Sequence, residues 1–500
     1  MSGPAPVALA SGAAAPAPSD DIAALAKGGR TNFLGFLLRL AARLPFLFIA
    51  GRLYGAENLG RFASAVIVVE FAAQLATLGQ KRGLAQQLAA ADRPAPSIIA
   101  DGLLLCLAVS AVLACLLWLF PAPLFPSGRY DAVERLLPLV IFPIAAGDIA
   151  LAALAYRYDI AATVRARSIV EPWVLSIAAG ALWFVIPGTG LIVAYFISMG
   201  AALVTALMPL VRSYGLPRHW SPRPLEIGRQ AIANLPIAGA DMVESGTRKL
   251  DLALLGAFAP PAVVGVYYVA QQVASLPQKL RTSFEPILGP VITRNLGEHN
   301  FNAIARQVCQ VGFWITAAQA GVALALGIPG EGVMGLVGPH FVGGNGALAF
   351  LLLAEVVAAT AVVSEAALIY IAAVRNLWIS LATVAVQATL TVGLIVAVRS
   401  AGFGPLWQAA AAAAALMLAL AFASLLKARL LARLLGQRIN NWRWALLWAV
   451  APAGLVGWGA TRLPEWAELL FGIPAILFVY GLVIWRRGFG PEDRLLFSRH

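Results

Sequence analysis

Two stretches of the chain resemble each other and predict how it is built. Residues 51–62 read GRLYGAENLGRF, and residues 256–267 read GAFAPPAVVGVY. Each stretch leaves one apolar segment and enters the next through a short connection rich in glycine or proline. The register that aligns them also superposes Arg43 on Arg248. We therefore expect an internal repeat, in which each half of the chain begins with the same pair of segments.

The composition around these stretches is that of a membrane protein. Hydrophobic residues make up 60% of the chain and charged residues only 12%, with a mean hydropathy of +0.81. Soluble domains have about 45–50% apolar and 25% charged residues. Apolar runs of about 20 residues recur along the chain, and each could cross about 30 Å of hydrocarbon. Helices are expected because the strict alternation of membrane barrel strands is absent.

The predicted fold is an all-α integral membrane bundle of about fourteen transmembrane helices. Two six-helix lobes, residues 31–212 and 229–427, are joined by a cytoplasmic linker at 213–228. An extra helix pair follows at 443–486, and the Ala/Pro/Ser-rich residues 1–30 are expected to form a disordered cytoplasmic tail. The expected spans are 31–53, 60–84, 98–120, 135–157, 165–187, 190–212, 229–256, 262–288, 307–329, 346–372, 377–399, 403–427, 443–462 and 467–486.

Charge indicates the orientation in the membrane. Placing the N-terminus inside assigns most of the 36 Lys and Arg residues to cytoplasmic loops, where such residues are enriched. The bias persists along the chain, which predicts a multi-pass protein of the bacterial inner membrane with both termini cytoplasmic. The net charge of +12 is scattered over short loops and forms no patch interleaved with aromatic residues, so nucleic acid is not an expected partner.

The sequence offers little for metal or cofactor chemistry. Its four histidines, His219, His299, His340 and His500, lie far apart and lack the spacing of metal ligands. Its three cysteines provide no disulfide framework. We therefore expect no metal, no cofactor and no enzymatic activity.

The seventh predicted span has the densest set of intramembrane charges. Asp241, Glu244, Arg248 and Asp251 fall within an arc of roughly 80° of one helix. Each such charge costs about 2.5–3.5 kcal/mol when it faces lipid at mid-bilayer. This face is therefore expected to point into the bundle or into a water-filled cavity, whereas Lys249 lies off it and is expected to snorkel to the membrane surface.

Arginines of the first span suggest an anionic cargo. Arg39 and Arg43 share one face of that span, without a carboxylate from the same helix, and Arg43 lies near the bilayer centre. Guanidinium groups bind phosphate oxygens in bidentate geometry, so pyrophosphate is the expected group. Glu70 and Lys279 are further intramembrane charges of interest. A structural alternative remains open, in which these charges only pair between helices.

The chain resembles the Wzx-type polysaccharide flippases, which share a superfamily with MATE drug exporters and the lipid II flippases of the MurJ type. The similarity spans roughly residues 31–427. It consists of Asn32-x-x-Gly35, the loop from Gly51 to Phe62, Leu78-Gly79, Asp251-x-x-x-x-Gly256, Gly265-x-Tyr267 and Phe284-x-Pro286-x-x-x-Pro290.

This resemblance implies two six-helix lobes around a V-shaped cavity and transport by alternating access. The implied cargo is a polyprenyl-diphosphate-linked oligosaccharide, with membrane lipids and a glycan polymerase or glycosyltransferases as partners. A cationic cavity is also implied, and this role falls on Arg39, Arg43 and Arg248. The mixed charge of the seventh span departs from a purely cationic lining, so ion coupling through Asp241 or Glu244 stays open.

Two other functions remain to be separated from this one. A cation-coupled multidrug exporter would depend on carboxylates and not on arginines. A membrane glycan polymerase or glycosyltransferase would need a large extramembrane region, whereas the connections here are short and contain no acidic catalytic pair.

Overall fold

The computed structural model describes residues 44–90, 93–157, 159–217, 220–280, 292–490 and 493. Within these ranges the regular secondary structure is entirely helical. Nine of the described helices are long and apolar enough to cross a membrane, which confirms the predicted all-α, multi-span class. They are Leu44–Ala76, Ala95–Leu119, Glu134–Tyr156, Gly190–Tyr214, Phe301–Gly327, Pro339–Ile371, Ala373–Ser400, Pro405–Leu435 and Glu465–Gly488.

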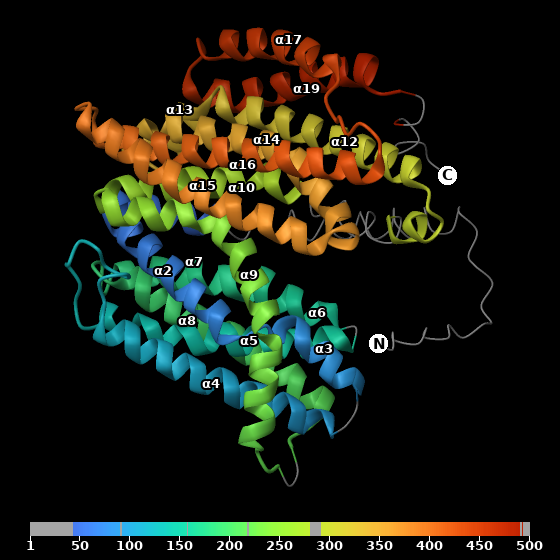
Figure 1. Cartoon of the computed structure of the whole chain (residues 1–500). Helices are drawn as coiled ribbons and strands as arrows, with labels where there is room; N and C mark the ends of the chain where they lie inside the picture. Colours follow the sequence, from blue (N-terminus) through green and yellow to red (C-terminus); the bar gives the residue numbers. More distant parts are fainter. Residues whose placement is uncertain are drawn as a thin grey trace.

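The first half of the chain forms one group of helices, the N-lobe, in the lower part of Figure 1. It begins with residues 44–54, whose last turn is the π-helix η1 (Ala50–Tyr54). Gly55 has a φ of +77° and interrupts the helix before the second span. The following elements are α2 (Gly55–Ala76), α3 (Gln80–Ala90), α4 (Ala95–Leu119), η2 (Glu134–Val140), α5 (Ile141–Tyr156), α6 (Ile160–Thr163), η3 (Val164–Val170), α7 (Glu171–Trp183) and α8 (Gly190–Tyr214).

The second half forms a matching group, the C-lobe, in the upper part of Figure 1. Proline opens α9, α10 and α16, because it lacks the N–H that the first helical turn cannot use. Gly436 ends α16 in the left-handed conformation. The elements are α9 (Pro224–Phe258), α10 (Pro261–Leu280), α12 (Phe301–Gly327), α13 (Gly330–Val337), η5 (Pro339–Gly344), α14 (Asn345–Ile371), α15 (Ala373–Ser400) and α16 (Pro405–Leu435).

A C-terminal helix pair packs on the far side of the C-lobe. It consists of α17 (Trp444–Ala460) and a second run made of α18 (Glu465–Ala467), η6 (Glu468–Gly472), α19 (Ile473–Val483) and η7 (Ile484–Gly488). Buried apolar residues of both, including Ala449 and Ile476, form a hydrophobic cluster with Phe313 of α12. Figure 1 shows the pair lying above α12 and α14.

Helices occupy all of the predicted spans that the structure describes. Most of the first span, 31–53, lies outside the described residues, as does the end of the eighth, 262–288. The seventh span is the long helix α9, which crosses from the N-lobe to the C-lobe in Figure 1. Its charged residues keep it below the hydropathy of the nine apolar spans, although its length of 35 residues is ample.

The two lobes meet at the helices that follow the repeated stretches, α2 and α10. A Cβ built on Gly60 of α2 would lie 1.7 Å from the carbonyl oxygen of Pro261. A Cβ on Gly265 of α10 would lie 2.0 Å from the carbonyl oxygen of Ala56. Only glycine permits this approach of two backbones, and these two glycines occupy the same position in the two aligned stretches.

Candidate functional site

A large cavity lies between the two lobes, and we refer to it as the chamber. Its volume is about 990 Å³, at the upper end of the range for pockets that bind drug-sized ligands. The N-lobe contributes residues 46–47 and parts of α2, α7 and α8 to its wall. The C-lobe contributes parts of α9, α10, α14, α15 and α16. Its charged lining residues are Glu70, Glu171, Lys249, Glu355, Glu365 and Lys427.

Within the described residues, the chamber reaches the surface at one end of the bundle and is closed at the other. Ile369, Tyr370 and Val374, at the connection from α14 to α15, line the chamber and are exposed. At the opposite end, Gly60 and Gly265 bring α2 and α10 together. There the Arg52 guanidinium also donates hydrogen bonds of 3.2 and 3.1 Å to the carbonyl oxygen of Leu336 in α13. Access to the chamber is therefore from the end that contains the α14–α15 connection.

An ion pair joins the lobes across the chamber wall. The Lys249 ammonium group on α9 donates a hydrogen bond to the Glu70 carboxylate on α2. Both side chains keep about a third of their surface exposed, at 33% and 37%. The pair is therefore reachable from the chamber, and an incoming charged group can compete for either member.

A second lysine lies deeper in the C-lobe wall. The Lys427 ammonium of α16 is 3.0 Å from a carboxylate oxygen of Glu365 on α14 and donates a 3.1 Å hydrogen bond to Ser380 on α15. Asn376 donates a 3.4 Å bond to the other oxygen of Glu365. Lys427 is buried, whereas Glu365 is 36% exposed. Three helices of the C-lobe thus hold one cation at the chamber surface.

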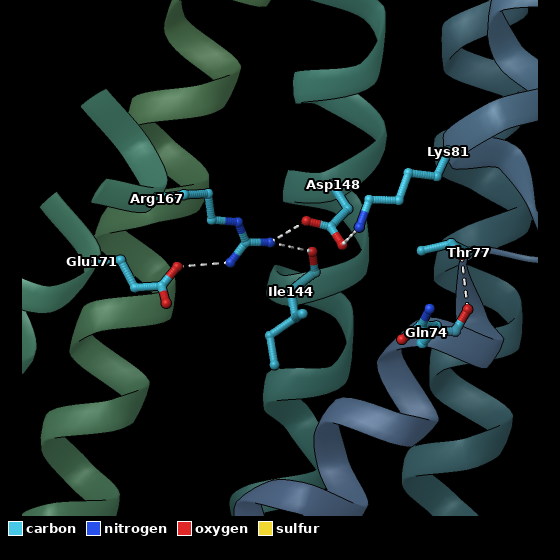
Figure 2. A network of polar contacts seen from close by, with 7 residues as sticks. All are labelled: Gln74, Thr77, Lys81, Ile144, Asp148, Arg167 and Glu171. Atoms are coloured by element: carbon cyan, nitrogen blue, oxygen red, sulfur yellow. Dashed lines mark hydrogen bonds and ion pairs between the residues drawn. The ribbon is translucent and has the colours of Figure 1, made fainter. Parts of the chain in front are cut away.

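In the N-lobe, Glu171 of the chamber wall is the end of a four-residue charge network. Figure 2 shows Arg167 between two carboxylates: it donates a 2.8 Å bond to Glu171 and another bond to Asp148. Asp148 also accepts a 3.0 Å bond from Lys81, which is half exposed. Arg167 donates further to the carbonyl oxygen of Ile144, at 3.2 Å. The network fixes η3, α5 and α3 together behind the chamber.

The described wall contains more carboxylates than cations. Four glutamates face two lysines among the lining residues. Ion pairs join Glu70 to Lys249, Glu365 to Lys427 and Glu171 to Arg167, so a cation compensates each of these three glutamates. The described part of the chamber wall therefore contains paired charges of both signs and is not a purely cationic surface.

Several residues predicted for the site cannot be placed in this geometry. Arg39 and Arg43 lie outside the described residues. Asp241, Glu244 and Arg248 belong to α9 and Lys279 to α10, but their side chains are not described. Their roles remain predictions.

Asp251 and Glu70 are described, and their surroundings differ. Glu70 lines the chamber, as the ion pair above shows. Asp251 is fully buried between α9 and α10, where its carboxylate accepts hydrogen bonds from the Tyr267 hydroxyl and from the Gln271 amide. It lies outside the chamber lining, while Gln271 belongs to it.

Sequence reasoning missed three charged residues of the chamber. Lys249 was expected to snorkel to the membrane surface, but it pairs with Glu70 of the other lobe. Lys427, at the end of the predicted span 403–427, and Glu171, within the predicted span 165–187, were not among the predicted site residues. A charge inside an apolar run is a signal that applies to all three. The packing of the helices, however, decides which of these charges come together.

Within the described residues, no group of three or more His, Cys, Asp or Glu side chains is placed to hold a metal ion.

Comparison with known proteins identifies the fold. No protein-family model and no curated protein matches the sequence. Among solved structures, the inward closed conformation of the lipid II flippase MurJ is similar with a TM-score of 0.68, 12% sequence identity, and coverage of 93% of this chain and 99% of that one. An inward-facing multidrug resistance MATE family transporter of the MOP superfamily gives a TM-score of 0.64 at 16% identity, covering 80% and 98%.

A third similar structure is a MOP superfamily transporter from Pyrococcus furiosus, described as having a binding pocket of reverse polarity that suggests a different function. Its TM-score is 0.56 at 15% identity, with coverage of 83% of this chain and 96% of that one. At these identities the likeness concerns the fold. The chain is thus a multi-pass membrane protein with the fold shared by MATE transporters and the MurJ flippase.

Proposed function

We propose that this protein flips a polyprenyl-diphosphate-linked oligosaccharide from the cytoplasmic to the outer leaflet of the bacterial inner membrane, by alternating access of the chamber. The protein contributes binding and movement and no bond chemistry. In this proposal the end with the α14–α15 connection faces the cytoplasm, in accord with the distribution of Lys and Arg residues.

The observation that supports the proposal is the chamber with two lysines in its wall, whose carboxylate partners an incoming anion can replace. Lys249 and Lys427 are held at the wall by carboxylates that are themselves a third exposed. A diphosphate offers several negative oxygens to the same ammonium groups, and charge-assisted bonds of this kind are strong. The diphosphate therefore replaces Glu70 and Glu365 as partner of the two lysines, while Arg39, Arg43 and Arg248 are proposed to add further cationic contacts.

The extent of the structural similarity is in keeping with a lipid-linked cargo. The similarity to the lipid II flippase covers 93% of this chain, whereas the similarities to the two transporters cover 80% and 83%.

Transport requires the two ends of the chamber to exchange their open and closed states. The end closed by Gly60 and Gly265 must separate, and the open end must close, for the head group to leave on the other side. Breaking the Lys249–Glu70 pair on substrate binding removes one of the links between the lobes. The cargo thereby lowers the free energy needed for the lobes to rock.

The test is glycan export in cells that require this protein for a surface glycan. Lys249→Gln and Lys427→Gln, singly and together, should lower export at least tenfold for the double variant at equal protein levels. Arg462→Gln is the matched control, because Arg462 stacks on Trp458 at 4.0 Å in the C-terminal pair, away from the chamber. Normal export by the double variant would contradict the proposal.

A cation-coupled multidrug exporter is a second candidate, favoured by the carboxylate majority of the described wall. In that case Glu70 and Glu365 bind the coupling ion or a cationic drug, and the two lysines neutralise these carboxylates when nothing is bound. Glu70→Gln and Glu365→Gln should then abolish drug efflux, while the lysine variants retain it. Measuring efflux and glycan export with the same four variants separates the two functions.

A further inference from the structure

The two lobes contribute different polar groups to the described chamber wall. Both lysines of the lining, Lys249 and Lys427, belong to helices of the C-lobe. The described N-lobe lining contains Glu70 of α2, Glu171 of α7 and Tyr195 of α8, without a lysine or an arginine. The cations and the N-lobe carboxylates therefore lie on different sides of the chamber.

The two N-lobe carboxylates each have a free oxygen atom. Glu70 and Glu171 use only Oε2 in their ion pairs, with Lys249 and Arg167 respectively. Neither Oε1 atom is hydrogen-bonded to a described residue, and Figure 2 shows the second oxygen of Glu171 without a contact to the residues drawn. The side chains are 37% and 21% exposed, so a molecule in the chamber can reach them.

Glu365 of the C-lobe wall has no such free oxygen. Its Oε1 accepts a hydrogen bond from Asn376, and its Oε2 pairs with Lys427. A group that donates hydrogen bonds therefore finds free acceptors at the N-lobe glutamates and not at Glu365.

Tyr195 adds a free hydroxyl to the N-lobe wall. Its side chain is more than nine-tenths buried, and its ring meets that of Phe62 edge-on, with 5.7 Å between the ring centroids. The carboxylates of Glu70 and Glu171 lie close enough to the Tyr195 hydroxyl to act on it electrostatically. Among the described residues the hydroxyl has no hydrogen-bond partner, so it can both donate to and accept from a molecule in the chamber.

These free groups indicate which part of the cargo the N-lobe wall can bind. Carboxylates repel the negative oxygens of a diphosphate, which are attracted to the lysines of the C-lobe. Sugar hydroxyls, in contrast, donate hydrogen bonds to carboxylates, and such charge-assisted bonds are stronger than those between neutral groups. Sugar hydroxyls also exchange hydrogen bonds with a tyrosine hydroxyl.

We propose that Glu70, Glu171 and Tyr195 bind hydroxyl groups of the cargo's sugars, while Lys249 and Lys427 bind its diphosphate. This inference rests on the proposed function and adds the orientation of the cargo to it. The oligosaccharide lies against α2, α7 and α8, so one molecule bridges the two lobes that have to move. When the diphosphate takes Lys249, it also releases Oε2 of Glu70 for a second hydrogen bond to the sugar.

The test compares two probes that differ only in their sugar. They are a polyprenyl diphosphate and the same lipid with one hexose on its diphosphate, and their affinities for the purified full-length protein are measured in nanodiscs. The unaltered protein should bind the glycosylated probe about tenfold more tightly, the effect of one hydrogen bond to a charged group. Tyr195→Phe and Glu171→Gln should each lower this preference at least threefold, and Tyr195→Phe should leave the affinity for the bare diphosphate unchanged.

Tyr214→Phe is the matched control. Tyr214 also lies on α8, but its hydroxyl donates a 2.7 Å hydrogen bond to the carbonyl oxygen of Ala153, and it lies outside the chamber lining. This variant should keep the full preference for the glycosylated probe.

The outcomes separate this inference from the proposed function. Equal affinity of the unaltered protein for the two probes, or an unchanged preference in both Tyr195→Phe and Glu171→Gln, overturns the sugar site while the diphosphate still binds. If the unaltered protein binds neither probe, the proposed function fails and the inference fails with it.

Discussion

Gly60 and Gly265 occupy the same position in the two repeated stretches of sequence and touch each other in the fold. A Cβ on Gly60 would lie 2.7 Å from the backbone nitrogen of Gly265, and a Cβ on Gly265 would lie 3.0 Å from that of Gly60. The two halves of the chain thus meet through their equivalent residues. This contact closes one end of the chamber, so the size of the side chain at these two positions controls access from that side.

Adding a side chain to this contact should prevent the end from closing. Gly60→Val and Gly265→Val place atoms where backbone carbonyl oxygens now lie, at 1.7 and 2.0 Å from a Cβ. Backbone cannot yield as a flexible side chain can, so α2 and α10 must separate. We expect transport to fall at least tenfold and a cysteine introduced at Ser64 of α2, which is buried at this end, to react faster with an impermeant thiol reagent from outside the cell.

Gly393→Val is the control, because a Cβ on Gly393 of α15 meets no atom within 4 Å. This variant should keep its transport and its labelling rate. If the Gly60 and Gly265 variants behave like it, the contact does not form the gate.

Exchanging the two residues of the Lys249–Glu70 ion pair tests whether the pair itself matters or the position of its ammonium group. Lys249→Glu alone places two carboxylates together, and Glu70→Lys alone places two ammonium groups together. Both should lose most of their transport. The double variant restores an ion pair between α2 and α9, but it places the ammonium group on the N-lobe.

Recovery in this double variant distinguishes a structural pair from a substrate contact. If the pair only links the lobes, export should return to near the original level. If Lys249 grips the cargo from α9, export should stay low although thermal stability recovers. Export rate and thermal stability are therefore measured on the same preparations, with Arg462→Gln as the reference for an exposed charge.

The hydropathy of the sequence was sufficient to predict the helices but not their neighbours. Apolar runs gave the spans because each helix satisfies its own backbone, which is a local requirement. The repeat placed Gly60 and Gly265 at equivalent positions, and their contact agrees with that symmetry. These features depend on short stretches of chain, so they can be read without knowing the packing.

The chamber depends on long-range packing and was harder to predict. A helical projection places Asp251 on the charged face of α9, yet its carboxylate is bound by Tyr267 of α10 and fully buried. Lys249 lies off that face and reaches the chamber, because Glu70 of the other lobe stands opposite. A projection shows which residues share a side of one helix and contains no information on what that side meets.

The network in Figure 2 should contribute to stability more than to transport. Asp148→Asn removes the carboxylate that Lys81 and Arg167 share, while Arg167 keeps its bond to Glu171. We expect a loss on the order of 2 kcal/mol, below the 3–5 kcal/mol typical of an isolated buried pair, because these side chains are partly exposed. The midpoint of thermal unfolding in detergent measures it.

Lys81→Gln provides the comparison within the same network. Lys81 is 51% exposed, so its ion pair is screened and should be worth at most about 1 kcal/mol. A loss for Lys81→Gln equal to that for Asp148→Asn would show that the position of Arg167 between the two carboxylates adds nothing to the stability.

Asp493 should make the attachment of the C-terminal helix pair sensitive to acid. Burial raises the pKa of its carboxyl group, but hydrogen bonds from Arg443, the backbone of Gly490, Gln310 and Trp314 outweigh burial and hold the pKa below the usual value. The bonds from Arg443 and Trp314 measure 2.7 and 2.8 Å. The ionised carboxylate therefore ties the start of α17 to α12.

The sign of the pH effect follows from this lowered pKa. A carboxyl group whose pKa is lower in the folded state stabilises the fold above its unfolded pKa of about 3.9, and this stabilisation is lost as the pH falls through the folded value. The gap in unfolding midpoint between the unaltered protein and Asp493→Asn should thus stay constant from pH 8 to 5 and shrink below about pH 4. Because other carboxylates titrate equally in both proteins, the gap isolates Asp493, and a gap that is unchanged at pH 3 would show that its hydrogen bonds do not favour the ionised form.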